Sequence, residues 1–424
     1  MDCSVPIRDV TFLVGENSTG KSSFISLYNI LHDFSSLNEV DFGVEQYNLG
    51  SFNDIVSPSS QNSSHFTIGL TQINNRRKTN KIFSILISYF NNEGLPKPLN
   101  FTCISNKSII SVRYIDNSYF YYLDKLGNKN QTQNGKNVFS FIKDVHNRKS
   151  KKDFKEFKMQ GTVPSEDSFI FFLPTIIASM ESQRSRSIDF DLGYQRHLFA
   201  RPCVWFAPIR TRPRRMYAGT KKKYSSEGEH TPFLLKKILG AEEDAEKFLD
   251  RMRKFGQDAS LFDDVKIHPY GGESSSPFEV QICFKEDAFS LDNVGYGVSQ
   301  ILPIVVELIS REKGTIFNIQ QPEVHLHPKA QAALGSLILD LLVTERKRFI
   351  IETHSEFIID RFRSSVREIK DSTKIDASVL FFERRQRENH VTEISILQDG
   401  RYNPDQPPEF REFFFEEKLN QLGI

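Results

Sequence analysis

A glycine-rich loop between an apolar segment and a helical segment constrains the fold of this chain more than any other feature. Residues 15–22 read GENSTGKS and fit the pattern G-x-x-x-x-G-K-[ST]. The preceding residues 10–14 are apolar and partly β-branched, and residues 21–31 have helical character. Glycine permits a tight turn in which backbone N–H groups point inward at a helix N-terminus, where they bind an anion. The loop therefore predicts a phosphate-binding site in an α/β protein.

Each residue type in this loop has an expected contact. Lys21 is predicted to reach the β- and γ-phosphates of a nucleotide, and the Ser22 hydroxyl is predicted to bind Mg²⁺. The expected cofactors are therefore ATP and Mg²⁺. The predicted nucleotide-binding residues of the loop are Gly15, Glu16, Asn17, Ser18, Thr19, Gly20, Lys21, Ser22 and Ser23.

Composition and charge limit the partners and the cellular compartment that we expect for this chain. Lys and Arg number 55 against 54 Asp and Glu, so no strong overall field attracts nucleic acid or a membrane. The apolar runs at 169–178 and 301–309 are too short to span a bilayer, and the N-terminus lacks a secretory pattern. We therefore expect a cytoplasmic protein with no membrane partner. The cysteines are widely separated and are expected to be reduced thiols: Cys3, Cys103, Cys203 and Cys283.

Changes in pattern along the chain suggest three parts. Residues 65–122 contain short alternating runs broken by Asn, Gly and Pro, which indicate antiparallel strands. Residues 126–165 are polar, as in an exposed insertion, and helical character returns over 231–261. The expected parts are an N-terminal lobe with the loop and antiparallel strands at 1–125, an insertion with a helical subdomain and a basic loop at 126–285, and a C-terminal lobe at 286–424.

Three further motifs follow in the C-terminal part. DNVGYGVSQ at 292–300 opens an apolar helix with glycines, which offers a second set of N–H groups to a phosphate. Taken by itself, this motif is better explained as an ordinary helix start. TIFNIQQPEVHLHP at 315–328 runs from an apolar strand into a polar tip, where P-loop ATPases carry an acid near Mg²⁺. IIETHS at 350–355 ends another apolar strand in a polar cluster. The predicted residues are Gly295, Gly297, Ser299 and Gln300 for the nucleotide, and Gln320, Gln321, Glu323 and His354 for catalysis.

A metal site is the rival interpretation of the third motif. Glu323, His325 and His327 alternate along an extended segment and would share one face, as metal ligands do. This hypothesis makes the chain a metallohydrolase, but it leaves the other three motifs unexplained.

Taken together, the four motifs resemble those of one family, the ABC-type ATPases related to the overcoming-lysogenization-defect (OLD) proteins and, more distantly, to the chromosome-maintenance (SMC) and recombination ATPases. GENSTGKSS is similar to the Walker A motif and NVGYGVSQILPI to the signature segment. QPEVHLHPKAQAALG is similar to Walker B with the D-loop, and FIIETHSEFII to the switch-histidine strand. LGSFNDIV, WFAPIRTRPRRMY and the final ILQDGRYNPDQPPEFREFFFEE resemble a stand-alone subgroup of the family.

The resemblance implies a fold and a mechanism. The expected fold is an α/β, ABC-type (SMC/OLD-like) P-loop NTPase head with a mixed sheet, an antiparallel β lobe and a helical insertion. Two copies would sandwich ATP, with residues 15–22 of one copy on the phosphates and Gly297 and Ser299 of the other over the γ-phosphate. His354 would sense the γ-phosphate.

Three departures from the family pattern affect these expectations. Walker B normally ends in an acid, whereas Gln320 occupies the position that is usually Glu in the closest subgroup and Gln321 the one that is usually Gln. Gln320 is either natural or an introduced Glu→Gln change, and in both cases slow or trapped hydrolysis is expected. Residues 1–9 leave room for fewer strands before the loop than the family usually has, and no Toprim-like nuclease region follows His354. Asp54 is a further candidate for catalysis or for the surroundings of Mg²⁺. Arg210 is a candidate either for a phosphate contact or for a structural salt bridge.

The missing nuclease region bears on the partners. Stand-alone members of the family often occur in bacterial anti-phage defence, so we expect a separately encoded effector, a nuclease or toxin, beside the second copy of the chain. The alternative is a DNA-handling ATPase of the recombination or chromosome-maintenance kind. Its candidate nucleic-acid surface is the basic cluster of Arg210, Arg212, Arg214, Arg215, Lys221, Lys222 and Lys223.

Overall fold

The computed structural model divides the chain into two compact units. It describes residues 4–32, 42, 49–56, 64–74, 81–105, 108–115, 118–125, 143–144, 146–147, 154–157, 202–220, 223–369, 373–386 and 388–413. The smaller unit comprises Met1–Ser4 and Ser23–Arg201, and the larger unit comprises Val5–Ser22 and Pro202–Ile424. The glycine-rich loop therefore belongs to the same unit as the three C-terminal motifs.

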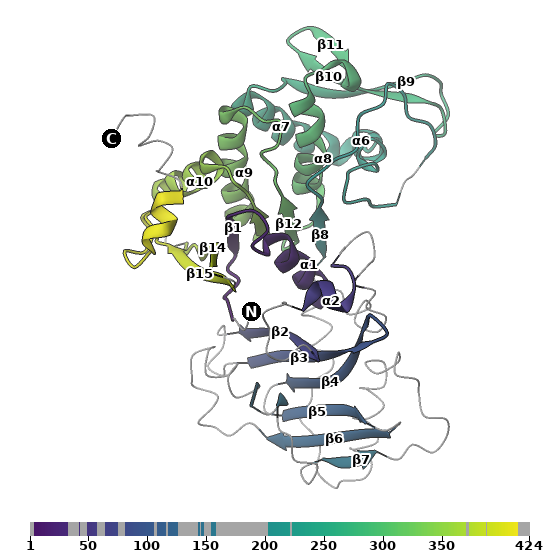
Figure 1. Cartoon of the computed structure of the whole chain (residues 1–424). Helices are drawn as coiled ribbons and strands as arrows, with labels where there is room; N and C mark the ends of the chain where they lie inside the picture. Colours follow the sequence, from purple (N-terminus) through teal and green to yellow (C-terminus); the bar gives the residue numbers. More distant parts are fainter. Residues whose placement is uncertain are drawn as a thin grey trace. The chain divides into compact units, whose positions relative to one another are not determined.

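A six-stranded mixed sheet, with the order β15-β14-β1-β13-β12-β8, forms the centre of the larger unit (Figure 1). Its strands are β1 (Val10–Gly15), β8 (Cys203–Phe206), β12 (Ile316–Gln320), β13 (Arg348–Glu352), β14 (Ala377–Arg385) and β15 (Glu388–Ile396). The strands from β14 to β8 run parallel to their neighbours, and β15 is antiparallel to β14. Every residue of β1 is buried, as in a parallel strand with both faces covered.

Helices and a small antiparallel sheet complete the larger unit. The helices are α6 (Thr231–Leu239), α7 (Glu242–Ala259), α8 (Tyr296–Ser310), α9 (Pro328–Glu345) and α10 (Glu356–Glu368), with a 3₁₀ turn η4 (Leu291–Asn293) before α8. The small sheet has the order β11-β10-β9 and contains β9 (Asp264–Pro269), β10 (Phe278–Phe284) and β11 (Asp287–Ser290). Residues 298–309 of α8 are all buried, which explains why its sequence is apolar on every side.

Two helix starts next to the site have specific caps. Pro328 occupies the first turn of α9, and Nδ1 of His327 accepts a hydrogen bond from the backbone N–H of Ala330 at 3.3 Å. The Oγ of Ser355 accepts from the N–H of Ile358 at 3.2 Å and caps α10. These caps fix where the loops after β12 and β13 end.

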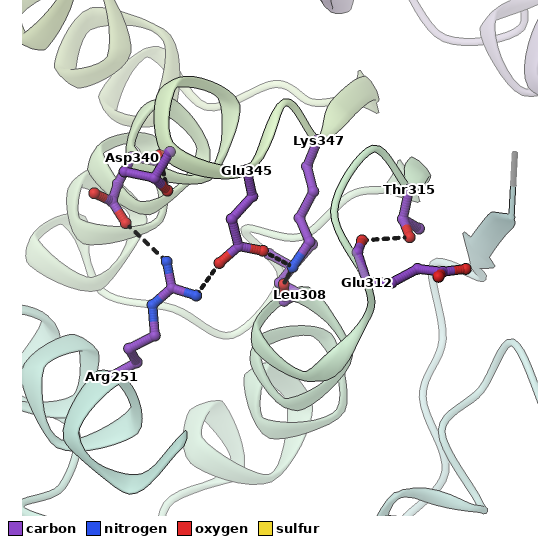
Figure 2. Close-up of polar contacts among 8 residues, drawn as sticks. Arg251, Leu308, Glu312, Thr315, Asp340, Glu345 and Lys347 are labelled. Atoms are coloured by element: carbon purple, nitrogen blue, oxygen red, sulfur yellow. Dashed lines mark hydrogen bonds and ion pairs between the residues drawn. The ribbon is translucent and has the colours of Figure 1, made fainter. Parts of the chain in front are cut away.

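A buried lysine joins three helices to β13 (Figure 2). Lys347 precedes β13, and its Nζ donates to the Leu308 carbonyl of α8 at 2.7 Å and lies 2.5 Å from Oε2 of Glu345. Arg251 of α7 pairs with Glu345 and, at 3.4 Å, with Asp340 of α9. Burial lowers the pKa of Lys347, and the neighbouring Glu345 opposes that shift. The buried charge of Lys347 thus has partners, and the cluster holds α7, α8 and α9 against the start of β13.

The smaller unit contains a six-stranded antiparallel sheet with the order β2-β3-β4-β5-β6-β7. Its elements are α2 (Phe52–Ile55), β2 (His65–Asn74), β3 (Lys81–Asn92), β4 (Leu95–Ser105), β5 (Ser108–Ile115), β6 (Ser118–Lys125) and β7 (Lys155–Phe157). The helix α1 (Lys21–His32) begins in the larger unit, at the end of the glycine-rich loop, and continues into the smaller one.

A buried histidine organises a polar layer on this sheet. Nε2 of His146 lies 2.6 Å from Oγ of Ser88 in β3, and Nδ1 lies 2.8 Å from Oγ1 of Thr102 in β4. The His146 carbonyl accepts from Asn100 at 2.7 Å and from Arg113 at 2.8 Å. Burial lowers the pKa of His146 to about 3, and the nearby positive charge of Arg113 adds to the effect. His146 is therefore neutral and ties its own segment to the sheet.

The expected fold class is confirmed: the chain is α/β, with a mixed parallel sheet, a separate antiparallel lobe and helices over 231–259. The division into two units differs from the three parts expected at 1–125, 126–285 and 286–424, because the first strand pairs with C-terminal strands instead of with the antiparallel lobe. No helix in the described part of the chain is both long and apolar enough to cross a membrane.

Candidate functional site

The glycine-rich loop connects β1 to α1 and has three residues with positive φ. The values are 136° at Gly15, 61° at Ser18 and 99° at Gly20. A Cβ on Gly15 would lie 1.8 Å from the backbone oxygen of Phe382 in β14, so only glycine fits there. The N–H of Glu16 donates to the same oxygen at 3.2 Å. The loop is thus anchored on the neighbouring strand, while Glu16, Asn17 and Ser18 are exposed.

Lys21 folds back over this loop. Its Nζ donates to the backbone oxygens of Gly15 at 3.0 Å and Glu16 at 2.6 Å, and the residue is 4% exposed. Burial lowers the pKa of Lys21, while the charges of Glu352 and Glu16 oppose that shift. The ammonium group is therefore held at the place where the motif predicts a phosphate.

Two contacts stiffen the rest of the loop. The buried Thr19 hydroxyl donates to the backbone oxygen of Glu16 at 2.7 Å, and the Arg384 side chain of β14 donates to the backbone oxygen of Ser18 at 2.9 Å. Ser22 and Ser23 are exposed at the start of α1.

A line of hydrogen bonds runs from Ser22 across the edge of the sheet to Trp205. Oγ of Ser22 lies 3.0 Å from Oε1 and 2.9 Å from Oε2 of Glu352. Nε2 of Gln320 donates to Oε2 of Glu352 at 2.9 Å, and Oε1 of Gln320 accepts from the indole N–H of Trp205 at 3.0 Å. Glu352 is the register partner of Leu13 in β1 and of Gln320 in β12. The ends of three parallel strands thus bring these groups together.

Arg210 holds the turn after β12. It is 2% exposed, and its Nη2 donates to the backbone oxygens of Gln320 and Gln321, each at 3.2 Å. Gln321 has a φ of 44°, and its own backbone N–H donates to the backbone oxygen of Glu352 at 2.8 Å. Burial lowers the pKa of Arg210 to about 10, and Glu323 opposes the shift. Of the roles considered for Arg210, the geometry therefore favours a structural one on the strained turn.

Glu323 clamps the loop that carries His354. Its Oε2 accepts from the Thr353 hydroxyl at 2.8 Å and its Oε1 from the backbone N–H of His354 at 2.6 Å. The imidazole of His354 is partly exposed, and its pKa is lowered first by partial desolvation and second by the positive charge on Lys21. His354 and Lys21 thus belong to one site, and the neutral imidazole is suited to hydrogen bonding near a phosphate.

The signature segment has an exposed start and a buried continuation. Gly295 is the N-cap of α8, and Gly295 and Tyr296 are exposed. Ser299 is 4% exposed, and its hydroxyl donates to the Tyr296 oxygen at 2.8 Å; Gln300 is also buried. The contact of Ser299 with a partner's γ-phosphate stays a prediction. One helical turn separates Ser299 from the exposed start of α8, where backbone N–H groups are also available.

Gly297 is a point of close approach between two motifs. A Cβ there would lie 2.6 Å from the backbone oxygen of His325, and the rings of Tyr296 and His325 are 4.6 Å apart. The start of α8 is therefore packed directly on the turn that follows β12.

The contacts do not support the rival metal site. Glu323 binds Thr353 and His354, the His325 ring contacts Tyr296, and His327 caps α9. Within the described ranges, no group of three or more His, Cys, Asp or Glu side chains is placed to hold a metal ion.

The remaining candidates from the sequence are Asp54 and the basic residues between 212 and 223. Asp54 is in the smaller unit, where its Oδ2 accepts from the N–H and hydroxyl of Ser51 at 2.8 and 2.7 Å, and these bonds lower its pKa. Asp54 thus caps α2. Arg212, Arg214 and Arg215 are exposed, as is Lys223, whereas Lys221 and Lys222 lie outside the described residues.

Sequence reasoning missed the roles of Glu352 and Trp205. Glu352 was visible as the last residue of an apolar strand, which is where functional groups of parallel sheets gather. Trp205 had no local signal, because its partner Gln320 is 115 residues away.

A magnesium nucleotide fits these residues. The loop supplies backbone N–H groups and the Lys21 ammonium for phosphates, and the Ser22 hydroxyl and Glu352 carboxylate are hard oxygen donors. Mg²⁺ in nucleotide sites is bound by such oxygens together with the phosphates.

Comparisons with known proteins agree with an ATPase domain. Residues 206–359 match the family model of an AAA ATPase domain, so this part of the chain is similar to that family, in agreement with the predicted ATPase. The comparison with curated proteins gave no match.

Several of the solved structures to which the chain is similar are SMC head domains. One, bound to the C-winged helix domain of ScpA, is 11% identical with a TM-score of 0.40, and the alignment covers 92% of each chain. The SMC head from Thermotoga maritima is 10% identical, with a TM-score of 0.32 and 92% of each chain covered. A head from Pyrococcus furiosus, bound to the C-terminal domain of ScpA, is 9% identical with a TM-score of 0.36, covering 99% of this chain and 95% of that one.

Proposed function

We propose that this chain is an ATPase that binds ATP·Mg²⁺ in the loop at 15–22 and, with ATP bound, closes on a second copy of itself. The observation that carries the proposal is the convergence of Lys21, Ser22, Glu352 and His354 at the ends of β1 and β13. A buried cation, two oxygen donors and an exposed imidazole at one sheet edge are the groups that phosphate binding and phosphoryl transfer require.

The exposed surroundings of the turn after β12 support a second copy as the partner. Ile209 is 76% exposed beside Arg210, and Tyr296 is 42% exposed against His325. Exposed apolar side chains next to a polar site are typical of surfaces that a partner covers. The exposed N–H groups at the start of α8 would then complete the phosphate site of the other copy.

Slow hydrolysis is part of the proposal. The Gln320 amide cannot accept a proton from an attacking water, and Glu323 is engaged by Thr353 and His354. ATP would therefore stay bound for a long time before it is hydrolysed, and the closed dimer would be long-lived.

The test is the oligomeric state of the full chain, measured by size-exclusion chromatography with light scattering. We expect a dimer with ATP and Mg²⁺, and a monomer with ADP or without nucleotide. Lys21→Ala should lose both ATP binding and dimerisation, whereas the exposed-lysine control Lys313→Ala should keep both. A wild-type chain that binds ATP but stays monomeric would disprove the sandwich, and one that does not bind ATP would disprove the function.

We further propose that this cytoplasmic ATPase controls a separately encoded effector, a nuclease or toxin, in anti-phage defence. The support is the motif resemblance to stand-alone OLD-like ATPases. Co-purification of the neighbouring gene product with the wild-type chain, and its release from Lys21→Ala, is the expected outcome. An effector that binds both forms equally would rule out control by ATP.

DNA handling is the second candidate, favoured by three exposed arginines in one loop: Arg212, Arg214 and Arg215. Phosphate contacts make DNA affinity fall steeply with salt. If DNA is the ligand, replacing the three arginines by glutamate should abolish salt-dependent binding to duplex DNA, measured by fluorescence anisotropy. Unchanged binding would exclude this loop as the DNA surface.

A further inference from the structure

A carboxylate lies beside the Ser22 hydroxyl, but it comes from β13 and not from β12. Both oxygens of Glu352 are within 3.0 Å of the Ser22 hydroxyl oxygen. At the tip of β12, where the motif resemblance leads one to expect the acid, stands the neutral amide of Gln320. The site thus has a carboxylate, that of Glu352, at the expected end of the sheet, but on β13 instead of the adjacent strand β12.

The amide at position 320 is complementary to this arrangement. Nε2 of Gln320 donates to Glu352, and Oε1 of Gln320 accepts from Trp205, so both ends of the amide are satisfied. A glutamate in its place would have no N–H to offer and would put a second carboxylate against the first. Gln320 and Glu352 are register partners on adjacent parallel strands, so exchanging the two residues keeps the carboxylate at the same level.

The carboxylate of Glu352 is buried, and a bound cation would stabilise its negative charge. The residue is 4% exposed, and a buried carboxylate is stable only with positive charge or several hydrogen bonds around it. Ser22 and Gln320 supply hydrogen bonds from two sides. One carboxylate, one hydroxyl and the phosphate oxygens form a donor set that Mg²⁺ accepts, since this ion keeps several waters and needs few protein ligands.

We propose that Glu352 supplies the carboxylate that binds Mg²⁺ in this site, directly or through a bound water, and that Gln320 orients it. The proposal rests on the proposed function, because it concerns the same nucleotide site. It assigns the magnesium acid to the end of β13, next to the loop of His354, and gives Gln320 a positioning role.

The test compares ATP affinity with and without Mg²⁺ in the full chain. Without metal, the Glu352 carboxylate repels phosphate oxygens, so Glu352→Gln should bind ATP in EDTA as well as or better than wild type. With Mg²⁺, the same variant should bind at least about tenfold more weakly than wild type, because a metal ligand is lost. General damage to the fold would weaken binding in both conditions, so only the crossover supports the proposal.

Trp205 provides an optical readout of the same site. It is the single tryptophan of the chain and donates to Gln320, so its emission reports on the Gln320–Glu352 pair. Adding Mg²⁺ to the ATP-bound wild type should change Trp205 fluorescence, and adding it to Glu352→Gln should not. The exposed variant Glu368→Gln, which also removes one negative charge, should behave as wild type in both assays.

A double exchange tests the placement of the acid. Gln320→Glu combined with Glu352→Gln returns the carboxylate to β12, and we expect it to restore at least part of the affinity gain from Mg²⁺. Full retention of that gain in Glu352→Gln alone would overturn the proposal. Failure of the wild type to bind ATP in either condition would instead refute the proposed function.

Discussion

Among single residues, Gln320 has the most direct bearing on chemistry. Its amide is neutral, cannot take a proton, and is held by Glu352 and Trp205. A carboxylate introduced at this position would lie next to Glu352, and two adjacent carboxylates raise the pKa of one of them. A raised pKa suits a general base that works near neutral pH.

Gln320→Glu should therefore increase the steady-state rate of ATP hydrolysis. General-base catalysis contributes about 100-fold or more, so we expect kcat to rise by about that factor. The measurement is phosphate release at saturating ATP and Mg²⁺. Gln257→Glu, an exposed change on α7, is the matched control. Equal rates for Gln320→Glu and wild type would show that the neutral amide does not limit turnover.

Among the elements, the start of α8 and the turn after β12 are in direct contact at Gly297. The backbone oxygen of His325 occupies the space where a side chain would begin. His325 itself has a φ of 65°, so the turn has little freedom to move away. The absence of a side chain at position 297 is thus a packing requirement.

Gly297→Ala should destabilise the larger unit by about 1–3 kcal/mol, the usual cost of overpacking. Urea denaturation followed by circular dichroism measures the change. Gly272→Ala is the control, because a Cβ at Gly272 meets nothing within 4 Å. A loss no larger than that of the control would mean that the helix start shifts without strain.

The charge cluster at Lys347 acts on the same scale, since it joins α7, α8 and α9 (Figure 2). Lys347→Met keeps the length of the side chain but leaves the Leu308 oxygen without its donor. We expect a loss of about 3 kcal/mol, at the low end for a broken buried pair because Glu345 keeps Arg251. Arg401→Ala breaks the exposed pair with Asp399 and should cost less than about 1 kcal/mol. Equal losses in urea denaturation would contradict a special role for burial.

For the whole molecule, a buried histidine should make the smaller unit sensitive to acid. The pKa of His146 in the smaller unit is lowered to about 3, against an ordinary value of 6.5. Below pH 6.5 the unfolded chain therefore gains a proton that the folded unit does not. Stability falls as the pH drops from about 6.5 towards 3, by about 1.4 kcal/mol per pH unit for this one group, and the contribution is constant above and below that window.

Comparing wild type with His146→Gln isolates this contribution. The variant should lose part of the acid sensitivity between pH 6 and 4 in thermal unfolding of the smaller unit, even if it is less stable at pH 7. His390→Gln, an exposed change in the larger unit, serves as the control. Parallel pH profiles for His146→Gln and wild type would show that His146 is already protonated or not buried.

The sequence predicted the local parts of this fold better than the long-range ones. The strand, loop and helix around Lys21 follow from adjacent residues, and so do the strand ends that carry Gln320 and His354. The partnership of Ser22 with Glu352 spans 330 residues and depends on β13 pairing with β1, which no local pattern contains. The burial of Ser299 likewise depends on long-range packing, because a motif does not say which turn of its helix is buried.

The contact between Gly297 and His325 also has a consequence for an assembly of two subunits. In a closed pair, the α8 start of each subunit would meet the nucleotide of its mate, while its β12 turn would lie beside its own nucleotide. Because the two are packed against each other inside one subunit, a displacement caused by one occupied pocket must pass to the other. The two pockets would thus fill cooperatively, with a saturation curve steeper than a hyperbola, and a leucine at position 325 would make that curve shallower.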